Sequence, residues 1–587
     1  MGLLQKAIET YDAMEGLAGV YEEGKEPLAP VGHIVTRAQI EVTITPEGRF
    51  VGARTADREQ KIIIPVTEDS AGRTSAPAAH PLCEQLGYLS GRDAEKLQLY
   101  LEGLEKWVKS AHNHPKAAAV WAYVSGRTLL ADLASAGLSA EKEKDMICWR
   151  VVGLGTAQDT AVWKDRSLMN AYTAFYLSQL NGEKQVCMLT GQTGFVTWKH
   201  MKGAFSLNGN AKIISANDSA NFTYRGRFEA PEEAASVSYL ASQKAHNALK
   251  WLISTQGTIQ GNQRAFVCWN PRGIPVPKLH LPFLSPENDE PPRPTYRNYR
   301  DDLRRKLTSC KAELQADDQV IIAAFDAATT GRLAITYYNE LLGSDFLDRL
   351  AFWDETCCWY DPFQGVHAPA LYSIICFAFG TERGPSGKIE PDDKLAVQQM
   401  QRLLSCRIDQ AAFPLDIMQA IVTRAGNLQS YGRTNRHNLV FTACAVIRKY
   451  HMDHEKEELE LALEPERKDR SYQWGRLLAV MEKIEQDTYD RTEDRQTNAI
   501  RMQSVFVQRP GYAAKVVLDQ LKTAYYPRLS RPLRIAYDRL IGEIMEQLSL
   551  FGAADYGKPL TETYLPGYYL QKNALYARKN DEIVEEE

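Results

Sequence analysis

The sequence predicts an α+β fold: a mixed N-terminal region of antiparallel β-sheets and helices, followed by mainly α-helical regions that end in a C-terminal helical bundle. Before about residue 345, polar and apolar residues alternate in short runs, as they do in strands. Beyond that position, apolar residues recur almost throughout at helical spacing. The chain has 587 residues, which favours about three or more structural units.

The first strands are expected in a meander. Residues 33–66 predict an antiparallel meander whose three strands are Gln39–Thr45, Arg49–Arg54 and Lys61–Val66. A polar loop at 67–81 follows, and a loop of that length is uncommon unless it is functional or disordered.

Helical and strand patterns then alternate up to about residue 345. Helical spacing predicts helices at 1–14, 91–114, 171–181 and 232–253. Apolar runs predict short strands at Val186–Leu189, Lys212–Ser215 and Ala265–Trp269, and a hairpin of Gln319–Phe325 and Leu333–Tyr338. The proline-rich segment 271–294 predicts an internal boundary in the region 1–345.

Three further regions are expected after residue 345. A helical middle region spans 346–452, a glutamate-rich charged linker spans 453–470, and a helical bundle spans 471–587. In the bundle, Ser530 followed by Pro532 predicts the N-cap and first turn of a helix.

Composition limits the classes of protein that fit. The formal net charge is -5, so any nucleic-acid contact must come from local basic surfaces. The ten cysteines form no CxxC pair and predict buried free thiols in a reducing compartment. No apolar run approaches the ~18–20 residues of a membrane span, and the N-terminus lacks signal-peptide features. We expect a soluble, cytoplasmic protein with no membrane partner.

Two motifs resemble active centres only in part. Residues 383–388 resemble a phosphate loop but lack its first glycine and the Ser or Thr that follows its lysine, which favours a surface turn. Residues 112–114 read His-Asn-His and stand directly before Pro115. Their position predicts a helix-terminal cap in which the helix dipole favours histidine.

One histidine-rich segment could bind a metal. His451, Asp453 and His454 have suitable spacing, but they adjoin a glutamate-rich run, which favours a solvated face. We therefore expect no metal, no cofactor and no catalytic residue, so the protein is expected not to be an enzyme. A nuclease whose active site is assembled from distant residues stays an alternative.

Basic residues concentrate in one late segment. Residues 501–540 carry eight lysines and arginines against two acids, with Tyr512, Tyr525 and Tyr526 interleaved. Such a stripe can follow a phosphate backbone while aromatic rings stack on bases; the alternative is a solvated amphipathic face. Lys515 and Lys522 are seven residues apart, hence on one helix face.

Two earlier segments also combine cationic and amide side chains. The first joins Lys199–Lys212 to Asn217–Arg227, and the second is Gln260–Arg264, directly before a predicted strand. Amide and guanidinium groups suit base and sugar edges, whereas the alternative for each segment is a polar turn.

Several blocks, taken in order, carry a family resemblance. Tyr472–Ile484 reads Y-Q-W-G-R-L-L-A-V-M-E-K-I, and Gly72–Ser75 reads G-R-T-S. Further blocks are 215–217, 222–224, 230–235, 247–249, 266–269, 542–545 and 567–569. Together they resemble the large subunit of the type I-C CRISPR Cascade surveillance complex. Ala216 and Arg225 depart from the family pattern, as does a more polar tail after Gly552.

The resemblance implies a set of partners. The family's N-terminal part probes double-stranded target DNA for the PAM, opens the duplex and helps to hold the displaced strand, while guide RNA reads the sequence. The guide RNA (crRNA) complex contains backbone and 5′-end-capping CRISPR subunits, and a separate helicase-nuclease is recruited for cutting. The bundle resembles a small subunit made from an internal start of the same gene, which we place near Met452.

The resemblance and the basic segments together suggest three groups of contact residues. For DNA and PAM binding we single out Arg73, Thr74, Ser75, Asn217, Asn262 and Gln263. For phosphate binding we single out Lys199, Lys202, Lys212, Arg225 and Arg227. For the displaced strand we single out Arg501, Lys515, Lys522, Arg531 and Arg534. A scaffold subunit without direct DNA reading is the other alternative, and steep salt dependence of DNA binding would distinguish the two.

Overall fold

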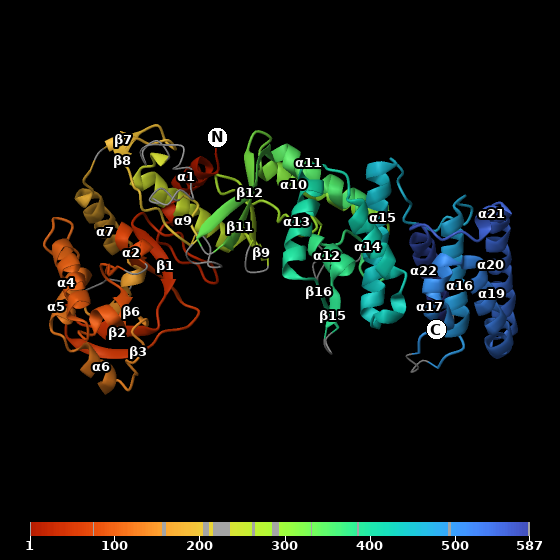
Figure 1. Cartoon of the computed structure of the whole chain (residues 1–587), viewed down its shortest axis with the longest axis horizontal. Helices are drawn as coiled ribbons and strands as arrows, with labels where there is room; N and C mark the ends of the chain where they lie inside the picture. The colour runs from red at the N-terminus through yellow and green to blue at the C-terminus, as the bar shows by residue number, and fades with distance from the viewer. Residues whose placement is uncertain are drawn as a thin grey trace. The chain divides into compact units, whose positions relative to one another are not determined.

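In the computed structural model, the chain forms two compact units (Figure 1). It describes residues 2–73, 76–154, 160–182, 184–203, 211–214, 235–260, 264–284, 293–329, 331–383, 387–490 and 495–584. Unit 1 comprises Met1–Val276 and Asp318–Leu341, and unit 2 comprises Pro277–Asp317 and Leu342–Glu587. The chain therefore passes between the units three times, first just after the start of the predicted boundary segment.

The first sheet of unit 1 has the strand order β3-β2-β6-β5. Its strands are β2 (Ile40–Ile44), β3 (Phe50–Thr55), β5 (Glu84–Gln85) and β6 (Met146–Val151). The β2–β3 pair is the antiparallel hairpin that the alternation predicted, whereas β2 and β6 are parallel. Gly48 in the hairpin turn has φ +74°, and a Cβ there would lie 2.7 Å from the backbone N of Tyr123.

The predicted third strand of the meander belongs to another sheet. Strand β4 (Lys61–Pro65) pairs antiparallel with β1 (His33–Arg37), so the predicted meander is wrong at this point. The free edge of β2 is taken instead by β6, about a hundred residues further along the chain. Alternation of polar and apolar residues indicates a strand, but it does not show which other strand pairs with it.

Short helices surround these two sheets. They are α2 (Glu68–Gly72), α3 (Leu86–Leu89), α4 (Ala94–Val108), α5 (Pro115–Ser125), α6 (Leu129–Ser135), η2 (Val162–Lys164) and α7 (Arg166–Gln179). Their apolar faces form one core with the sheet, in which Trp107, Trp149, Trp163 and Tyr172 are fully buried.

The second core of unit 1 lies on a sheet of order β12-β11-β10-β9. The strands are β9 (Thr258–Gln260), β10 (Arg264–Trp269), β11 (Gln319–Thr329) and β12 (Arg332–Leu342), packed with α1 (Leu3–Ala13) and α9 (Tyr239–Gln256). The short η1 (Glu15–Leu17) follows α1 and has no buried residue. The predicted hairpin at 319–338 is therefore confirmed. The indole of Trp269 donates to Thr10 Oγ1 at 2.9 Å, which links the sheet to α1.

Two predicted strands differ in position. A short hairpin pairs β7 (Lys184–Val186) with β8 (Thr193–Phe195), so the predicted strand at Val186–Leu189 begins earlier than expected. Lys212 forms a single bridge to Arg332, and the structure has no strand at 211–214 within its described part. Runs of three or four apolar residues give too little periodicity to fix strand bounds.

Unit 2 is mainly helical, as expected. Its helices up to the charged segment are α10 (Tyr296–Glu313), α11 (Gly343–Thr356), α12 (Leu371–Phe379), α13 (Asp393–Ile408), α14 (Leu415–Ala425), η5 (Leu428–Ser430) and α15 (Arg433–His454). Two small hairpins interrupt them, β13 (Trp359–Asp361) with β14 (Gly365–His367), and β15 (Thr381–Arg383) with β16 (Lys388–Glu390).

The rest of unit 2 is the predicted bundle. Its helices are α16 (Arg470–Gln486), α17 (Asn498–Arg501), α18 (Gln503–Gln508), α19 (Pro510–Gln520), the π turn η6 (Leu521–Tyr525), η7 (Tyr526–Arg528), α20 (Arg531–Ser549), α21 (Ala553–Tyr556) and α22 (Tyr564–Val584). Helices α16 and α22 pack backbone to backbone at two glycines. A Cβ on Gly475 would lie 1.9 Å from the carbonyl O of Tyr564, and one on Gly567 would lie 2.2 Å from that of Tyr472.

All ten cysteines are free, and all but Cys310 are buried, which confirms the prediction of buried free thiols. Within the described residues, no helix combines the length and low charge that crossing a membrane requires.

Candidate nucleic-acid interface

The polar loop at 67–81 begins with a short helix. Thr67 caps α2: its Oγ1 accepts from the N–H of Ser70 at 3.1 Å, and its own N–H donates to Ser70 Oγ at 2.9 Å. Helix α2 ends at Gly72, so Arg73 is the first residue beyond it.

Arg73 is engaged inside the loop. Its guanidinium donates to both carboxylate oxygens of Glu84, at 2.6 and 2.7 Å, and also to the carbonyl O of Ala78. The same guanidinium lies 4.7 Å from the ring centroid of Tyr88. Glu84 is fully buried and also accepts from the backbone N–H of His80. In this conformation Arg73 closes the loop rather than presenting free donors outward.

Three lysines that are distant in sequence gather near this loop. Lys202 donates to the carbonyl O of Arg73 at 2.9 Å, and Lys199 pairs with Asp69 of α2. Lys212 is the third lysine, held by backbone hydrogen bonds to Gly331 and Leu333. Burial, with the charges of Lys212 and Arg73, lowers the pKa of Lys202.

We call Arg73, Lys199, Lys202 and Lys212 the N-terminal cationic cluster. The charges of Lys212 and Arg73 contribute to the lowered pKa of Lys202, which indicates a positive potential at its ammonium group that an anion would relieve. The predicted residues Thr74, Ser75, Asn217, Arg225, Arg227, Asn262 and Gln263 lie outside the described residues.

The second group of predicted contacts lies on consecutive elements of the bundle. Arg501 ends α17, Lys515 is in α19, Lys522 is in the π turn, and Arg531 and Arg534 are in the first turn of α20. All are exposed except Arg534, which is half-buried. We call these five residues the C-terminal basic stripe.

None of the five forms an ion pair with any residue in the described part of the chain. Arg539, on the same helix as Arg531, instead pairs with Glu543 at 3.1 Å. The first turn of α20 contains no acidic residue, and the side chain of Ser530 does not cap it, although Ser530 occupies the predicted N-cap position. Cations at the positive end of a helix oppose its dipole, at a cost of about 0.3–1 kcal/mol each.

Two features of the predicted stripe are corrected. Tyr525 is buried, and its hydroxyl accepts from Arg495 at 3.0 Å and Asn498 at 3.2 Å, so its ring cannot stack on a base. Tyr512 is 61% exposed and is the aromatic side chain free for stacking. Lys515 and Lys522 are separated by the start of the π turn, whose wider winding shifts Lys522 from the face expected for a regular helix.

The two motifs that resemble active centres only in part, residues 383–388 and 112–114, also have structural explanations. Arg383 and Lys388 are paired at the ends of β15 and β16, and of the residues between them, 384–386 lie outside the described residues. His114 caps a helix, but at the N-terminus of α5, where its Nδ1 accepts from the N–H of Lys116 at 3.2 Å. The dipole there disfavours a histidine cation, so the predicted reason for the cap is wrong.

Sequence reasoning missed the acidic partners. Glu84 follows Arg73 by eleven residues, and Asp69 precedes Lys199 by 130. No helical or strand spacing connects either pair. The bidentate contact to Glu84 depends on a closed loop, which local patterns do not predict.

These observations define a class: an α+β protein of two units, with a cationic cluster beside a closed loop and, on a helical bundle, a basic stripe that has no ion pair within the described part of the chain. A family model described as CRISPR-associated protein (Cas_Csd1) matches residues 9–576. The chain belongs to this CRISPR-associated family, which makes it a large subunit of the Cascade type. No curated protein matches it.

Proposed function

We propose that this chain is the non-catalytic large subunit of a type I-C RNA-guided effector complex. In that role it recognises the PAM in double-stranded DNA, aids opening of the duplex and holds the displaced strand. A separate helicase-nuclease then cuts the DNA. The partners are the crRNA-bound backbone and capping subunits, together with a small subunit made from the same gene.

The C-terminal basic stripe carries this proposal. The whole chain has a net charge of -5, yet the stripe holds five cations that form no ion pair with the described residues, two of them at the positive end of α20. Cations at that end of the helix lower the stability of α20. Residues that lower stability in this way are expected at functional sites. A phosphate backbone would relieve the excess charge and accept from the free N–H groups of the first turn.

The N-terminal cationic cluster supports the duplex-facing part of the proposal. Lys199 and Lys202 would position phosphates, which fixes the register of the DNA without reading its sequence. The buried Arg73–Glu84 pair would hold the loop that contains Thr74 and Ser75. We assign PAM contact to these two residues together with Asn217, Asn262 and Gln263.

The test uses the reconstituted complex with Arg531→Gln and Arg534→Gln combined. Target affinity is measured over a range of salt concentrations, on duplexes with and without the PAM. Each lost phosphate contact on a single strand lowers the slope of log K against log salt by about 0.7, so we expect a loss of about 1.4. Both duplexes should weaken alike, because phosphate contacts carry no sequence information.

The free energy of unfolding separates this result from damage to the fold. The double variant removes two cations from the positive end of α20, so it should be more stable than the parent by about 0.3–1 kcal/mol per residue. Arg539→Gln, an exposed arginine on the same helix with its own partner, should keep the parental salt slope. An unchanged slope in the double variant would favour the scaffold alternative.

A further inference from the structure

His451 lies in the last turn of α15 and is not on a solvated face. Its side chain is 6% exposed, which corrects the expectation for this segment. The other two predicted ligands point elsewhere. Asp453 pairs with Lys449 at 2.8 Å, and His454 hydrogen bonds to the carbonyl O of Phe413 at 2.9 Å.

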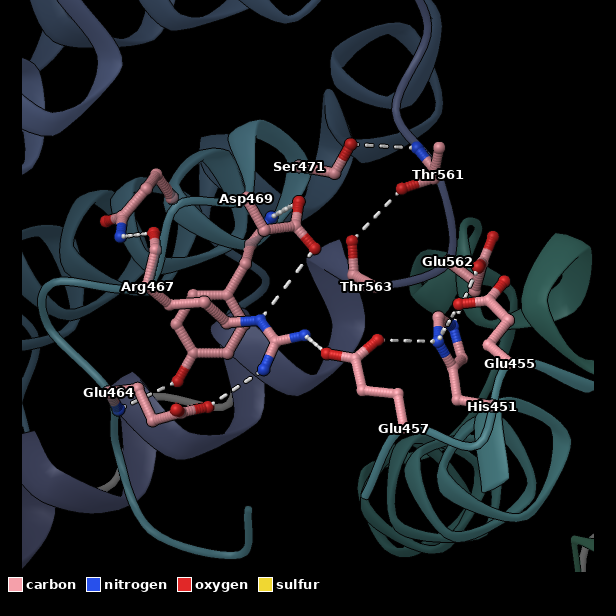
Figure 2. A network of polar contacts seen from close by, with 12 residues as sticks. His451, Glu455, Glu457, Glu464, Arg467, Asp469, Ser471, Thr561, Glu562 and Thr563 are labelled. Atoms are coloured by element: carbon pink, nitrogen blue, oxygen red, sulfur yellow. Dashed lines mark hydrogen bonds and ion pairs between the residues drawn. The ribbon is translucent and has the colours of Figure 1, made fainter. Parts of the chain in front are cut away.

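Three carboxylates from two parts of unit 2 surround the His451 imidazole (Figure 2). Its Nδ1 lies 2.9 Å from Glu455 Oε2, one helical turn further along, and 3.4 Å from Glu457 Oε2 in the following segment. Its Nε2 lies 3.0 Å from Oε1 of Glu562, just before α22. Both ring nitrogens therefore face carboxylate oxygens.

Negative charge exceeds positive charge in this network. Figure 2 shows five carboxylates joined through His451 and one arginine: Glu455, Glu457, Glu464, Asp469 and Glu562. Arg467 supplies one positive charge, and His451 supplies a second only when it is protonated.

A neutral imidazole would leave one of these contacts without a proton. If Nε2 keeps its hydrogen and donates to Glu562, the Nδ1 lone pair faces the oxygens of Glu455 and Glu457. Three electron-pair donors then converge on one point, and their ligand atoms all lie within 4.8 Å of one another. A proton on Nδ1 can be donated to these oxygens, whereas a divalent cation can accept an electron pair from all three donors at once.

The spacing suits a small transition-metal ion. Ligand atoms at bond lengths of about 2.0–2.2 Å in a tetrahedral site lie roughly 3.3–3.6 Å apart. The Nδ1–Glu457 distance of 3.4 Å lies in this range, whereas the Nδ1–Glu455 distance of 2.9 Å would have to lengthen on binding. Glu562 would act as the carboxylate that commonly orients a metal-bound histidine. The other oxygen of Glu457 accepts from Arg467 at 2.5 Å, so Oε2 stays available to a metal.

We propose that Nδ1 of His451 and the carboxylates of Glu455 and Glu457 bind one divalent ion of the zinc class, with Glu562 holding the imidazole. Water would complete the coordination. The ion would tie the end of α15 to the charged segment 453–470, and through Glu562 to the start of α22. Its role is structural and does not depend on DNA binding.

The test is titration of the metal-stripped, full-length protein with Co²⁺, followed by calorimetry and by visible absorption of the bound ion. We expect one tight Co²⁺ per chain that Zn²⁺ displaces. Glu455→Gln and Glu457→Gln should each weaken binding about tenfold or more, and Glu562→Gln about 10- to 100-fold. Lowering the pH should weaken binding, because a proton competes for Nδ1.

Glu464→Gln is the matched control. Glu464 belongs to the same network and accepts from Arg467 at 3.0 Å, but makes no contact with His451 in the described part of the chain. Its replacement should leave Co²⁺ affinity unchanged. Glu455 is half exposed, so Glu455→Gln should fold even where a His451 variant does not. Absence of a Co²⁺ equivalent sensitive to Glu455→Gln, or equal weakening by Glu464→Gln, would overturn the proposal.

Discussion

Gly475 determines how closely two helices of the bundle approach. Any Cβ at this position would meet the Tyr564 carbonyl O at 1.9 Å, a backbone atom that cannot move without shifting α22. Gly475→Ala should therefore destabilise the protein by about 3 kcal/mol or more, at the upper end of overpacking effects. The measurement is chemical denaturation of the full chain, with hydrogen exchange to locate the loss in unit 2.

Gly542 offers the matched control for Gly475. It lies within α20, and a Cβ there would meet nothing within 4 Å. Gly542→Ala should stabilise the protein by about 0.5–1 kcal/mol, because alanine loses less backbone entropy in a helix. If both alanine variants change stability in the same direction, the described contact between α16 and α22 is wrong.

The same contact explains part of the family resemblance. Gly475 is followed by Arg476, which is 2% exposed and donates to Gln571 of α22 at 2.9 Å and to the carbonyl O of Pro465 at 2.7 Å. The Y-x-x-G-R block thus joins α16 to α22 and to the charged segment. These residues identify the family through packing, which explains why no catalytic motif appears among them.

At the scale of elements, helices were easier to predict than strand partners. Leu477, Met481 and Ile484 are all fully buried, as their helical spacing predicted. The parallel partner of β2 is β6, separated from it by about a hundred residues, and alternation contains no information about such pairing. The π turn at Leu521–Tyr525 also departs from the regular spacing on which the helix predictions rely.

For the predicted contact residues, too, the sequence indicated position but not side-chain partners. Both basic segments could be located, because the positions of lysine and arginine are read directly from the sequence. It could not show that Arg73 faces Glu84, or that Tyr525 is buried. Those outcomes depend on which residues the fold brings together from distant positions.

Helix caps give a prediction for single elements. Asp392 caps α13, and its carboxylate accepts from the N–H groups of Lys394 and Leu395 at 3.0 and 3.3 Å. Asp392→Ala should cost about 1 kcal/mol in the free energy of unfolding. Ser530→Ala should cost almost nothing, because the Ser530 side chain makes no capping hydrogen bond. Urea denaturation of the two variants measures the difference, and equal losses would contradict it.

At the scale of the whole molecule, the order of the chain differs from the order of its units. Strands β11 and β12 belong to unit 1, although α10, which precedes them in the sequence, belongs to unit 2. The proline-rich segment 271–294 marks the first of these passages, but no compositional signal marks the return at Asp318. A linear sequence of regions is therefore an incomplete description of this protein.

Buried histidines give unit 1 a specific sensitivity to acid. Burial lowers the pKa of both His33 and His80 from 6.5 to about 4, and in each ring one nitrogen has no hydrogen-bond partner among the residues that the structure describes. Between pH 6.5 and 4 the unfolded chain binds protons at these positions and the folded chain does not. Stability is therefore fully present above pH 6.5 and falls as the pH falls towards 4.

The expected loss at pH 5 is about 2 kcal/mol for each histidine, relative to neutral pH. Hydrogen exchange of peptides from unit 1, compared at pH 7 and pH 5 after correction for intrinsic rates, measures it. His80→Gln should remove the part of the pH dependence that comes from one histidine, while His33 and the other unit 1 histidines with lowered pKa, His114, His200 and His246, keep theirs. Carboxylates with lowered pKa values, such as Glu41, act only below about pH 4.5, so they do not account for a loss in this window. Unchanged protection of unit 1 between pH 7 and pH 5 would show that these imidazoles reach solvent.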